Sequence, residues 1–212
     1  MQSAIRTLTA VAVLVGGGAA CQTTPTLAGA GVETETDQAL ELIGPVDIAV
    51  VPIEVGPGAP ETPAELVRTS AARALVLRRY SPLATDIVDE AIAASANRQG
   101  RAGTQEASFP VGTLGEDAIL HVEVERWDNP DWEALRSIDV AINARLTNPA
   151  NPDQVLWEAR LDREFRFSLE SGTASSSDRD FREACDTILA ALITTLPARP
   201  LQSDIGDGLM GQ

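Results

Sequence analysis

The chain has no lysine, one histidine (His121) and two cysteines (Cys21 and Cys185) among its 212 residues. The absence of lysine excludes a phosphate-loop lysine and a Schiff-base lysine. Zinc sites usually use several histidine or cysteine ligands, and this sequence has too few of them to form one. A hydrolytic triad would have to use His121 as its base, and no Gly-x-Ser-x-Gly motif accompanies it. We therefore expect no catalytic residue, no metal site and no cofactor, and a protein that is not an enzyme.

Basic charge is scarce as well. The sixteen basic residues, all arginine, face thirty-one acidic ones, and the formal net charge is −15 at pH 7. Binding to nucleic acid requires a basic footprint, and so does docking on anionic lipid headgroups. The composition therefore argues against nucleic acid as a partner and against a basic patch that binds headgroups.

Long hydrophobic runs are also missing. The apolar run from Leu8 to Val15 is too short to span a bilayer, which takes about 20 apolar residues. It follows the single charge of Arg6 and precedes small residues from Gly16 to Ala20. A basic start, a short apolar stretch and small residues before a cleavage point are the layout of an export signal.

The end of this segment, Gly18-Ala19-Ala20-Cys21, resembles the lipobox of bacterial lipoproteins. Gly18 departs from the bulky aliphatic residue usual at that position. The resemblance implies a signal peptide over residues 1–20 and acylation of Cys21, which would anchor the chain in a membrane. Gln22, in place of an aspartate, implies sorting to the periplasmic face of the outer membrane. The alternative is an ordinary cleaved signal with an incidental Cys21.

An acylated Cys21 would leave Cys185 without a partner in an oxidising compartment. Cys185 lies on the apolar side of an expected helix. It is either a buried small hydrophobic residue or an exposed thiol used in intermolecular pairing.

Beyond the signal, the sequence predicts a flexible tether over residues 21–44, one domain over 45–197 and a loose tail over 198–212. We expect an α+β fold with a mixed, largely antiparallel sheet, helices packed mainly on one side and the order β-α-β-α-β-β-β-α. The expected strands are Val46–Val55 with a break near Pro52, a short segment at Tyr80–Leu83, Asp117–Trp127, Ile138–Thr147 and Gln154–Phe167. The expected helices are Thr62–Arg78 with a capping box at Thr62 and Glu65, Thr85–Asn97 with Ile87 among its inward residues, and Asp178–Leu196. The last two strands should form a hairpin, with Asn148–Asp153 as the turn.

Aromatic residues make up only 4% of the chain, which makes its three tryptophans notable. Alternation places Trp157 on the apolar face of its strand and Trp127 on the polar face of another. Trp132 lies in the polar connection that follows. Aromatic side chains on a polar surface are typical of binding hot spots, so Trp127 and Trp132 form a candidate partner surface. The alternative is a local cluster that folds over the sheet edge.

Several short motifs carry a resemblance to known envelope proteins. They are Ile48-Ala49-Val50-Val51-Pro52, Tyr80-Ser81-Pro82-Leu83, Leu114-Gly115-Glu116-Asp117-Ala118-Ile119-Leu120 and Val155-Leu156-Trp157-Glu158, together with Cys21. With these motifs the chain resembles a family of Gram-negative outer-membrane lipoproteins of unknown function, and its order of elements is similar to the fold of the TolB N-terminal domain. The resemblance carries no catalytic residue.

Three functions are therefore open. The first is a non-catalytic interaction or assembly module of a cell-envelope system, which binds envelope proteins or forms a homo-oligomer. The second is a lipid- or substrate-handling auxiliary lipoprotein of an envelope ABC transporter. The third is an envelope hydrolase. An apolar groove between helix and sheet would favour the second function. A filled core with an exposed Trp132 loop would favour the first, and a cleft that gathers His121 with a serine and a carboxylate would favour the third.

Overall fold

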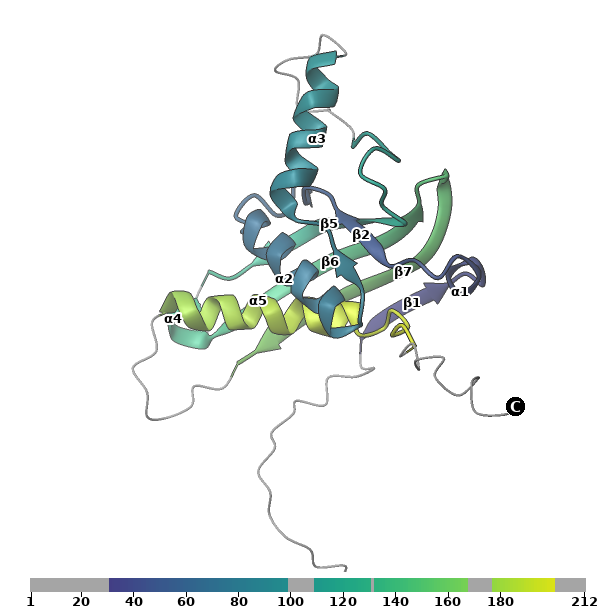
Figure 1. Cartoon of the computed structure of the whole chain (residues 1–212). Coiled ribbons are helices and arrows are strands. Elements are labelled where there is room, and N and C mark those ends of the chain that lie inside the picture. The colour runs from purple at the N-terminus through teal and green to yellow at the C-terminus, as the bar shows by residue number, and fades with distance from the viewer. Residues whose placement is uncertain (1–30, 99–108, 131, 168–176, 201–212) are drawn as a thin grey trace, which may run out of the picture.

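The computed structural model describes residues 31–98, 109–130, 132–167 and 177–200 (Figure 1). The expected signal peptide, Cys21, the first part of the expected tether and residues 201–212 of the expected tail lie outside the described residues. Within the described ranges, no helix is both long and apolar enough to cross a membrane.

The described residues form one mixed sheet with helices on both of its faces. The strands follow the order β1-β7-β6-β5-β2-β4, and β3 pairs with β5 beside β2. The strands are β1 (Val32–Thr36), β2 (Asp47–Val50), β3 (Glu54–Val55), β4 (Ser81–Pro82), β5 (Ala118–Asp128), β6 (Ser137–Asn148) and β7 (Asn151–Arg166). The helices are α1 (Ala39–Ile43), α2 (Ala64–Leu77), α3 (Thr85–Arg98), α4 (Trp132–Leu135) and α5 (Ser177–Ile193). Strands β1, β7, β6 and β5 pair antiparallel, whereas β2, β3 and β4 pair parallel, so the predicted fold class is confirmed.

Helices α2 and α5 lie side by side on one face of the sheet and cover the main core (Figure 1). The core side of β6 consists of alternate residues, as predicted, and each of them is at most 1% exposed: Ile138, Val140, Ile142, Ala144 and Leu146. Helix α3 packs on the opposite face, where Val88 joins Ala49, Val51 and Ile119 in a second, smaller core. The helices therefore lie mainly on one side, and most of the other face is left open.

The long hairpin of β6 and β7 was predicted correctly, and its turn is shorter than expected. Asn148 and Asn151 pair directly, which leaves Pro149 and Ala150 at the tip. The Asn148 side chain accepts a hydrogen bond from the Ala150 amide at 2.9 Å and donates one to Gln154 at 2.9 Å. These bonds let the strands continue almost to the tip of the turn.

The expected strand Val46–Val55 is divided into β2 and β3, and the division falls at Pro52 as predicted. Proline has no amide hydrogen to give to a neighbouring strand. The Val51 amide still donates to the Leu120 carbonyl, and pairing with β5 resumes at Glu54.

The predicted capping box of α2 is wrong. The Thr62 hydroxyl donates to the Ala59 carbonyl at 2.7 Å and does not accept from the Glu65 amide. Pro63 occupies the N-cap position without a side-chain capping bond. The amide of Thr62 also donates to the Ala59 carbonyl, at 3.1 Å, so the Thr62 side chain belongs to the turn that precedes the helix. Ile87, predicted to face inward from α3, is 50% exposed.

The predicted tether is wrong from residue 31 onward. Val32–Thr36 forms an edge strand on β7, and α1 follows, with Leu40 buried. The Asp37 carboxylate accepts from the Ala39 amide at 2.6 Å, and Gly44 ends α1 with a φ of 57°, a conformation that favours glycine. Only one of the five residues of β1 is apolar, which explains why the sequence did not show the strand as a core element.

Strand β5 contains a bulge that changes the face of its C-terminal end. Val124 pairs with Ile142 and Arg126 pairs with Ala141, so Glu125 is an extra residue. A one-residue insertion moves the following side chains to the opposite face. The predicted outward position of Trp127 is therefore wrong, and its ring lies in the main core with 3% exposure.

Candidate functional site

The face of β1, β7, β6 and β5 that points away from α2 and α5 carries mostly charged side chains, and we call it the open face. Its register brings together the acidic residues Glu33, Glu35, Glu123, Glu125, Asp139, Glu158, Asp162 and Glu164 with the basic residues Arg126, Arg145, Arg160 and Arg166. Glu54 of β3 joins them next to Glu123. Carboxylates outnumber guanidinium groups, so this face has a net negative charge.

Ion pairs that cross from strand to strand fix part of the open face. Arg126 of β5 donates to Asp139 of β6 at 3.0 Å and to Asp162 of β7 at 2.6 Å. Arg160 of β7 donates to Glu125 at the bulge at 2.9 Å. The hydrogen bonds that Arg126 donates to Asp139 and Asp162 raise its pKa further, so it stays charged at any ordinary pH.

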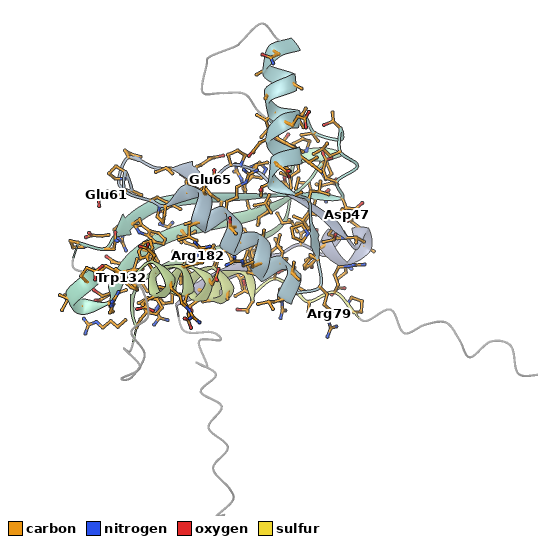
Figure 2. All side chains as sticks on the ribbon, turned by 60° about the vertical axis from the view of Figure 1, so that its left-hand side comes forward. Asp47, Glu61, Glu65, Arg79, Trp132 and Arg182 are labelled. Carbon is orange, nitrogen blue, oxygen red and sulfur yellow. The ribbon has the colours of Figure 1, made fainter. Side chains whose placement is uncertain are left out.

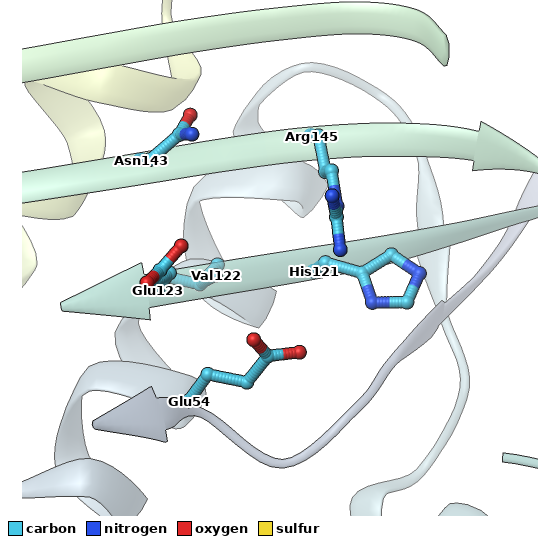
Figure 3. A pocket seen from close by; sticks show the side chains of 6 residues that line it. All are labelled: Glu54, His121, Val122, Glu123, Asn143 and Arg145. Carbon is cyan, nitrogen blue, oxygen red and sulfur yellow. The ribbon is translucent and has the colours of Figure 1, made fainter. Parts of the chain in front are cut away.

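A small hollow lies in the open face between β3, β5 and β6 (Figure 3). It is lined by Glu54, His121, Val122, Glu123, Asn143 and Arg145. Figure 3 shows the guanidinium group of Arg145 beside His121, with the Glu54 carboxylate turned toward them and Glu123 further along β5. The hollow measures about 20 Å³, which is the space of about one water molecule.

Asn143, one of the residues that line this hollow, has one side-chain atom without a hydrogen-bond partner among the described residues. Its amide nitrogen donates to Glu158 at 3.2 Å, while its buried Oδ1 has no hydrogen-bond partner among the described residues. A buried carbonyl oxygen is satisfied by an ordered water when no protein donor reaches it. The size and lining of the hollow fit such a water.

The surroundings of His121 favour the neutral form of its ring. Burial lowers its pKa below the ordinary value for histidine, the positive charge of Arg145 lowers it further, and Glu54 acts in the opposite direction. Its Nε2 lies 3.3 Å from the Thr147 hydroxyl. The hydroxyl beside His121 is thus that of a threonine, and not of the serine expected of a hydrolase.

The geometry around His121 does not suit hydrolysis. Thr147 is 4% exposed, and its hydroxyl is shared with the Ile119 carbonyl at 3.5 Å. A nucleophile must reach a bound substrate, and a space of about one water molecule holds no substrate. The arrangement offers a polar, water-sized depression in a charged surface.

A second, wider hollow of about 340 Å³ opens near the end of β5 that leads to α4. Its lining residues are Asp128, Pro130, Leu135, Ser137, Asp139 and Glu164. Within the described ranges, no group of three or more histidine, cysteine, aspartate or glutamate side chains is placed to hold a metal ion. This hollow extends the acidic surface of the open face.

The structure corrects the candidate partner surface at Trp127 and Trp132. Both rings are buried, with 3% and 7% exposure. Both contact Phe181 of α5 edge to face, at 6.3 and 5.2 Å between ring centres, and Arg136 lies over the Trp132 ring at 4.9 Å. The two rings therefore belong to a local aromatic cluster, which was the alternative prediction. Because they are buried, they cannot present a surface to a partner.

Cys185 is fully buried in the main core. Burial raises the pKa of its thiol from 9.0 to about 12, and the neighbouring Asp186 adds to this effect. A thiol of this kind is protonated and unreactive at neutral pH. Of the two predicted alternatives, the structure confirms that Cys185 is a buried hydrophobic residue.

No protein-family model matches the chain, and no curated protein matches it. Similar solved structures include a PelC dodecamer from Paraburkholderia phytofirmans, at 16% identity and a TM-score of 0.46, covering 80% of this chain and 98% of that one. They also include lipoprotein GNA1162 from Neisseria meningitidis, at 20% identity and a TM-score of 0.42, covering 68% and 96%. The C-terminal domain of LpoB from Salmonella enterica is similar at 11% identity and a TM-score of 0.36, covering 58% and 83%. The similar structures thus include a bacterial lipoprotein, and the likeness to the TolB N-terminal domain stays a prediction.

Proposed function

We propose that the protein is a lipoprotein anchored through Cys21 on the periplasmic face of the outer membrane. Its domain acts there as a non-catalytic interaction module of a cell-envelope system. The open face is the docking surface, and the partner is a protein that presents a basic surface to it. The anchor rests on the lipobox-like end of the export signal.

The open face is the observation that carries this proposal. It spans four strands, has no deep pocket of substrate size at His121 and carries more carboxylates than guanidinium groups. Ion pairs such as Arg126 with Asp139 and Asp162 hold its side chains in place before binding. A preordered surface of one predominant charge steers a complementary partner and selects against partners of like charge.

The role of a lipid- or substrate-handling accessory has less support. Such a role needs an apolar groove. The space between the sheet and helices α2 and α5 is filled with buried side chains, among them Trp157, Leu120 and Ile188, each 0% exposed. The hollows at His121 and near α4 are lined mainly by polar residues. A filled core and a charged surface favour docking of a protein over storage of a lipid.

The test is capture of the partner from detergent-solubilised envelopes with matched charge variants. The open-face variant replaces three exposed acids, Glu33→Gln, Glu35→Gln and Glu123→Gln. The control removes the same charge from the helical side with Glu61→Gln, Glu65→Gln and Glu183→Gln. Two of the control positions, Glu61 and Glu65, are labelled in Figure 2.

We expect the wild-type chain and the control to retain the same partner, and the open-face variant to bind it at least about tenfold more weakly at low salt. The difference should shrink at high salt, because salt screens exposed charges. Equal retention by both variants would show that the open face is not the docking surface.

A further inference from the structure

One end of the molecule carries an exposed basic and apolar patch that the net charge of the chain does not reveal. It consists of Val76, Leu77, Arg78, Arg79 and Arg199, at the end of α2 and in the segment after α5, and we call it the Leu77 patch. Leu77 is 74% exposed and Val76 is 57% exposed. Large apolar side chains so close to uncompensated charges indicate a surface that meets something other than water.

The three arginines of the Leu77 patch donate side-chain hydrogen bonds to main-chain carbonyls. Arg78 donates from Nε to the Leu196 carbonyl at 2.8 Å, and Arg79 donates to the Arg199 carbonyl at 3.0 Å. Arg199 donates back to the Arg79 carbonyl at 3.4 Å. These bonds position the guanidinium groups and leave their positive charge uncancelled.

Six other arginines of the fold differ from these three because they form ion pairs. Each lies within 4 Å of a carboxylate: Arg68, Arg73, Arg126, Arg136, Arg160 and Arg166. Within the described ranges, no carboxylate lies at that distance from Arg78, Arg79 or Arg199. In a chain with a net charge of −15, these three arginines form a local concentration of positive charge that no ion pair among the described residues cancels.

Helix capping explains only part of the Leu77 patch. Cations near a helix C-terminus are favoured by the helix dipole, and this accounts for Arg78 and Arg79 after the end of α2. It accounts neither for the exposure of Leu77 and Val76 nor for Arg199, which comes from a segment about 120 residues later.

We infer that the Leu77 patch contacts an anionic lipid surface and orients the anchored domain on it. Arginines beside exposed leucine and valine are the composition by which protein surfaces lie in the headgroup region. This inference rests on the proposed anchor at Cys21, which supplies the proximity that a small patch needs. It also revises the expectation from net charge that no basic patch would meet headgroups.

The length of the chain before the described domain allows this contact. Nine residues lie between Cys21 and Gly31, and the ten Cα–Cα steps between these two residues reach at most about 36 Å. From Gly31, strand β1 runs along β7 toward the turn of the hairpin, the end of the sheet where β2 and β4 begin next to Arg79. Helix α2 covers the face opposite the open face, so contact through the Leu77 patch leaves the open face free for a protein partner.

The test places the photoreactive residue benzoylphenylalanine at position 77 of the full, lipidated chain. The protein is reconstituted in vesicles of phosphatidylethanolamine and phosphatidylglycerol, and cross-links to lipid are measured. The matched control carries the same residue at position 135, because Leu135 is a similarly exposed leucine, at 64%. It lies beside Trp132 at the opposite end of the molecule from Arg79 (Figure 2).

We expect at least fivefold more lipid cross-linking at position 77 than at position 135. The excess should disappear in Arg79→Glu/Arg199→Glu, persist in Arg79→Lys/Arg199→Lys, and fall when phosphatidylcholine replaces phosphatidylglycerol. Equal cross-linking at the two positions in a chain that floats with the vesicles overturns this inference and leaves the anchor intact. The same holds if position 77 reacts with lipid only after removal of residues 201–212, because that tail would then be the occupant of the patch. A chain that does not float overturns the anchor and the inference together.

Discussion

At the scale of single residues, Arg68 is the one that the sequence least foretold. It is a charged residue on the side of α2 that faces the core, and it is only 1% exposed. Its Nε and Nη2 both donate to the Val50 carbonyl of β2, at 3.0 and 2.9 Å, and its Nη1 reaches Asp89 of α3. One guanidinium group therefore joins a helix from each side of the sheet to the point where β2 ends.

Replacing Arg68 should separate the parts of this interaction. Arg68→Ala should lower the free energy of unfolding by about 2–4 kcal/mol, because the Val50 carbonyl loses its donors and the side-chain stem leaves a cavity. Arg68→Met keeps most of the volume and should lose about 1–3 kcal/mol. Asp89→Asn should cost less than about 1 kcal/mol, because Asp89 is half exposed. Chemical denaturation measures all three, and an Arg68→Ala loss no larger than that of Asp89→Asn would contradict the assigned role.

His121 should make the fold sensitive to acid. Burial and Arg145 lower its pKa in the folded state below the ordinary value of about 6.5, so the folded state binds this proton less readily than the unfolded state does. The stability that the neutral ring supplies is complete above about pH 6.5 and is lost as the pH falls through the lower folded value. Unfolding measured from pH 7.5 to pH 5 should show a shallower decline for His121→Gln than for the wild type. Parallel declines would mean that His121 is not desolvated.

At the scale of secondary structure, the sequence predicted the elements with regular patterns. The clear alternation from Ile138 to Thr147 predicted both the core face of β6 and its pairing with β7. The apolar residues Val67, Ala71 and Leu75 repeat at helical spacing along α2, and each is 0% exposed in the core. These regions follow one period throughout, so a rule based on periodicity describes them well.

The sequence failed where one residue interrupts the period or where pairing supplies the order. Glu125 interrupts the alternation of β5 and reverses Trp127, and no local pattern marks the position of a bulge. The loop after β3 fits closely around this bulge, since a Cβ on Gly58 would lie 2.6 Å from the Glu125 carbonyl oxygen. Strand β1 depends on its register with β7, which becomes known only once the sheet has formed. The same limit hid the hollow at His121, because cross-strand register brings Arg145 beside it.

Deletion of Glu125 tests the bulge directly. Without this residue, alternation turns Trp127 toward the open face and exposes a ring that is now buried. The free energy of unfolding should fall by about 3–5 kcal/mol, the usual cost of losing a buried tryptophan. Glu125→Ala keeps the bulge and should cost less than about 1 kcal/mol, because it removes only a surface ion pair with Arg160. If the deletion and the substitution are equally mild, the bulge does not determine the face of Trp127.

At the scale of the whole molecule, charge is separated in a way that a net value of −15 conceals. The open face concentrates carboxylates, while Arg78, Arg79 and Arg199 gather at the end of α2. In a lipid-anchored protein, this separation of charge lets one surface contact the membrane while another binds a partner. Both proposed contacts therefore depend on whether Cys21 carries lipid.

Mass spectrometry of the N-terminus of the mature wild-type protein tests this claim most directly. We predict a first residue at Cys21 that bears diacylglycerol, with the protein in the membrane fraction. We also predict that Cys21→Ser appears as a soluble periplasmic protein or as an uncut precursor. One acyl chain holds a protein only reversibly, whereas several chains on one cysteine hold it stably. An unmodified N-terminus at another residue, in a protein that is soluble without any substitution, would contradict the account.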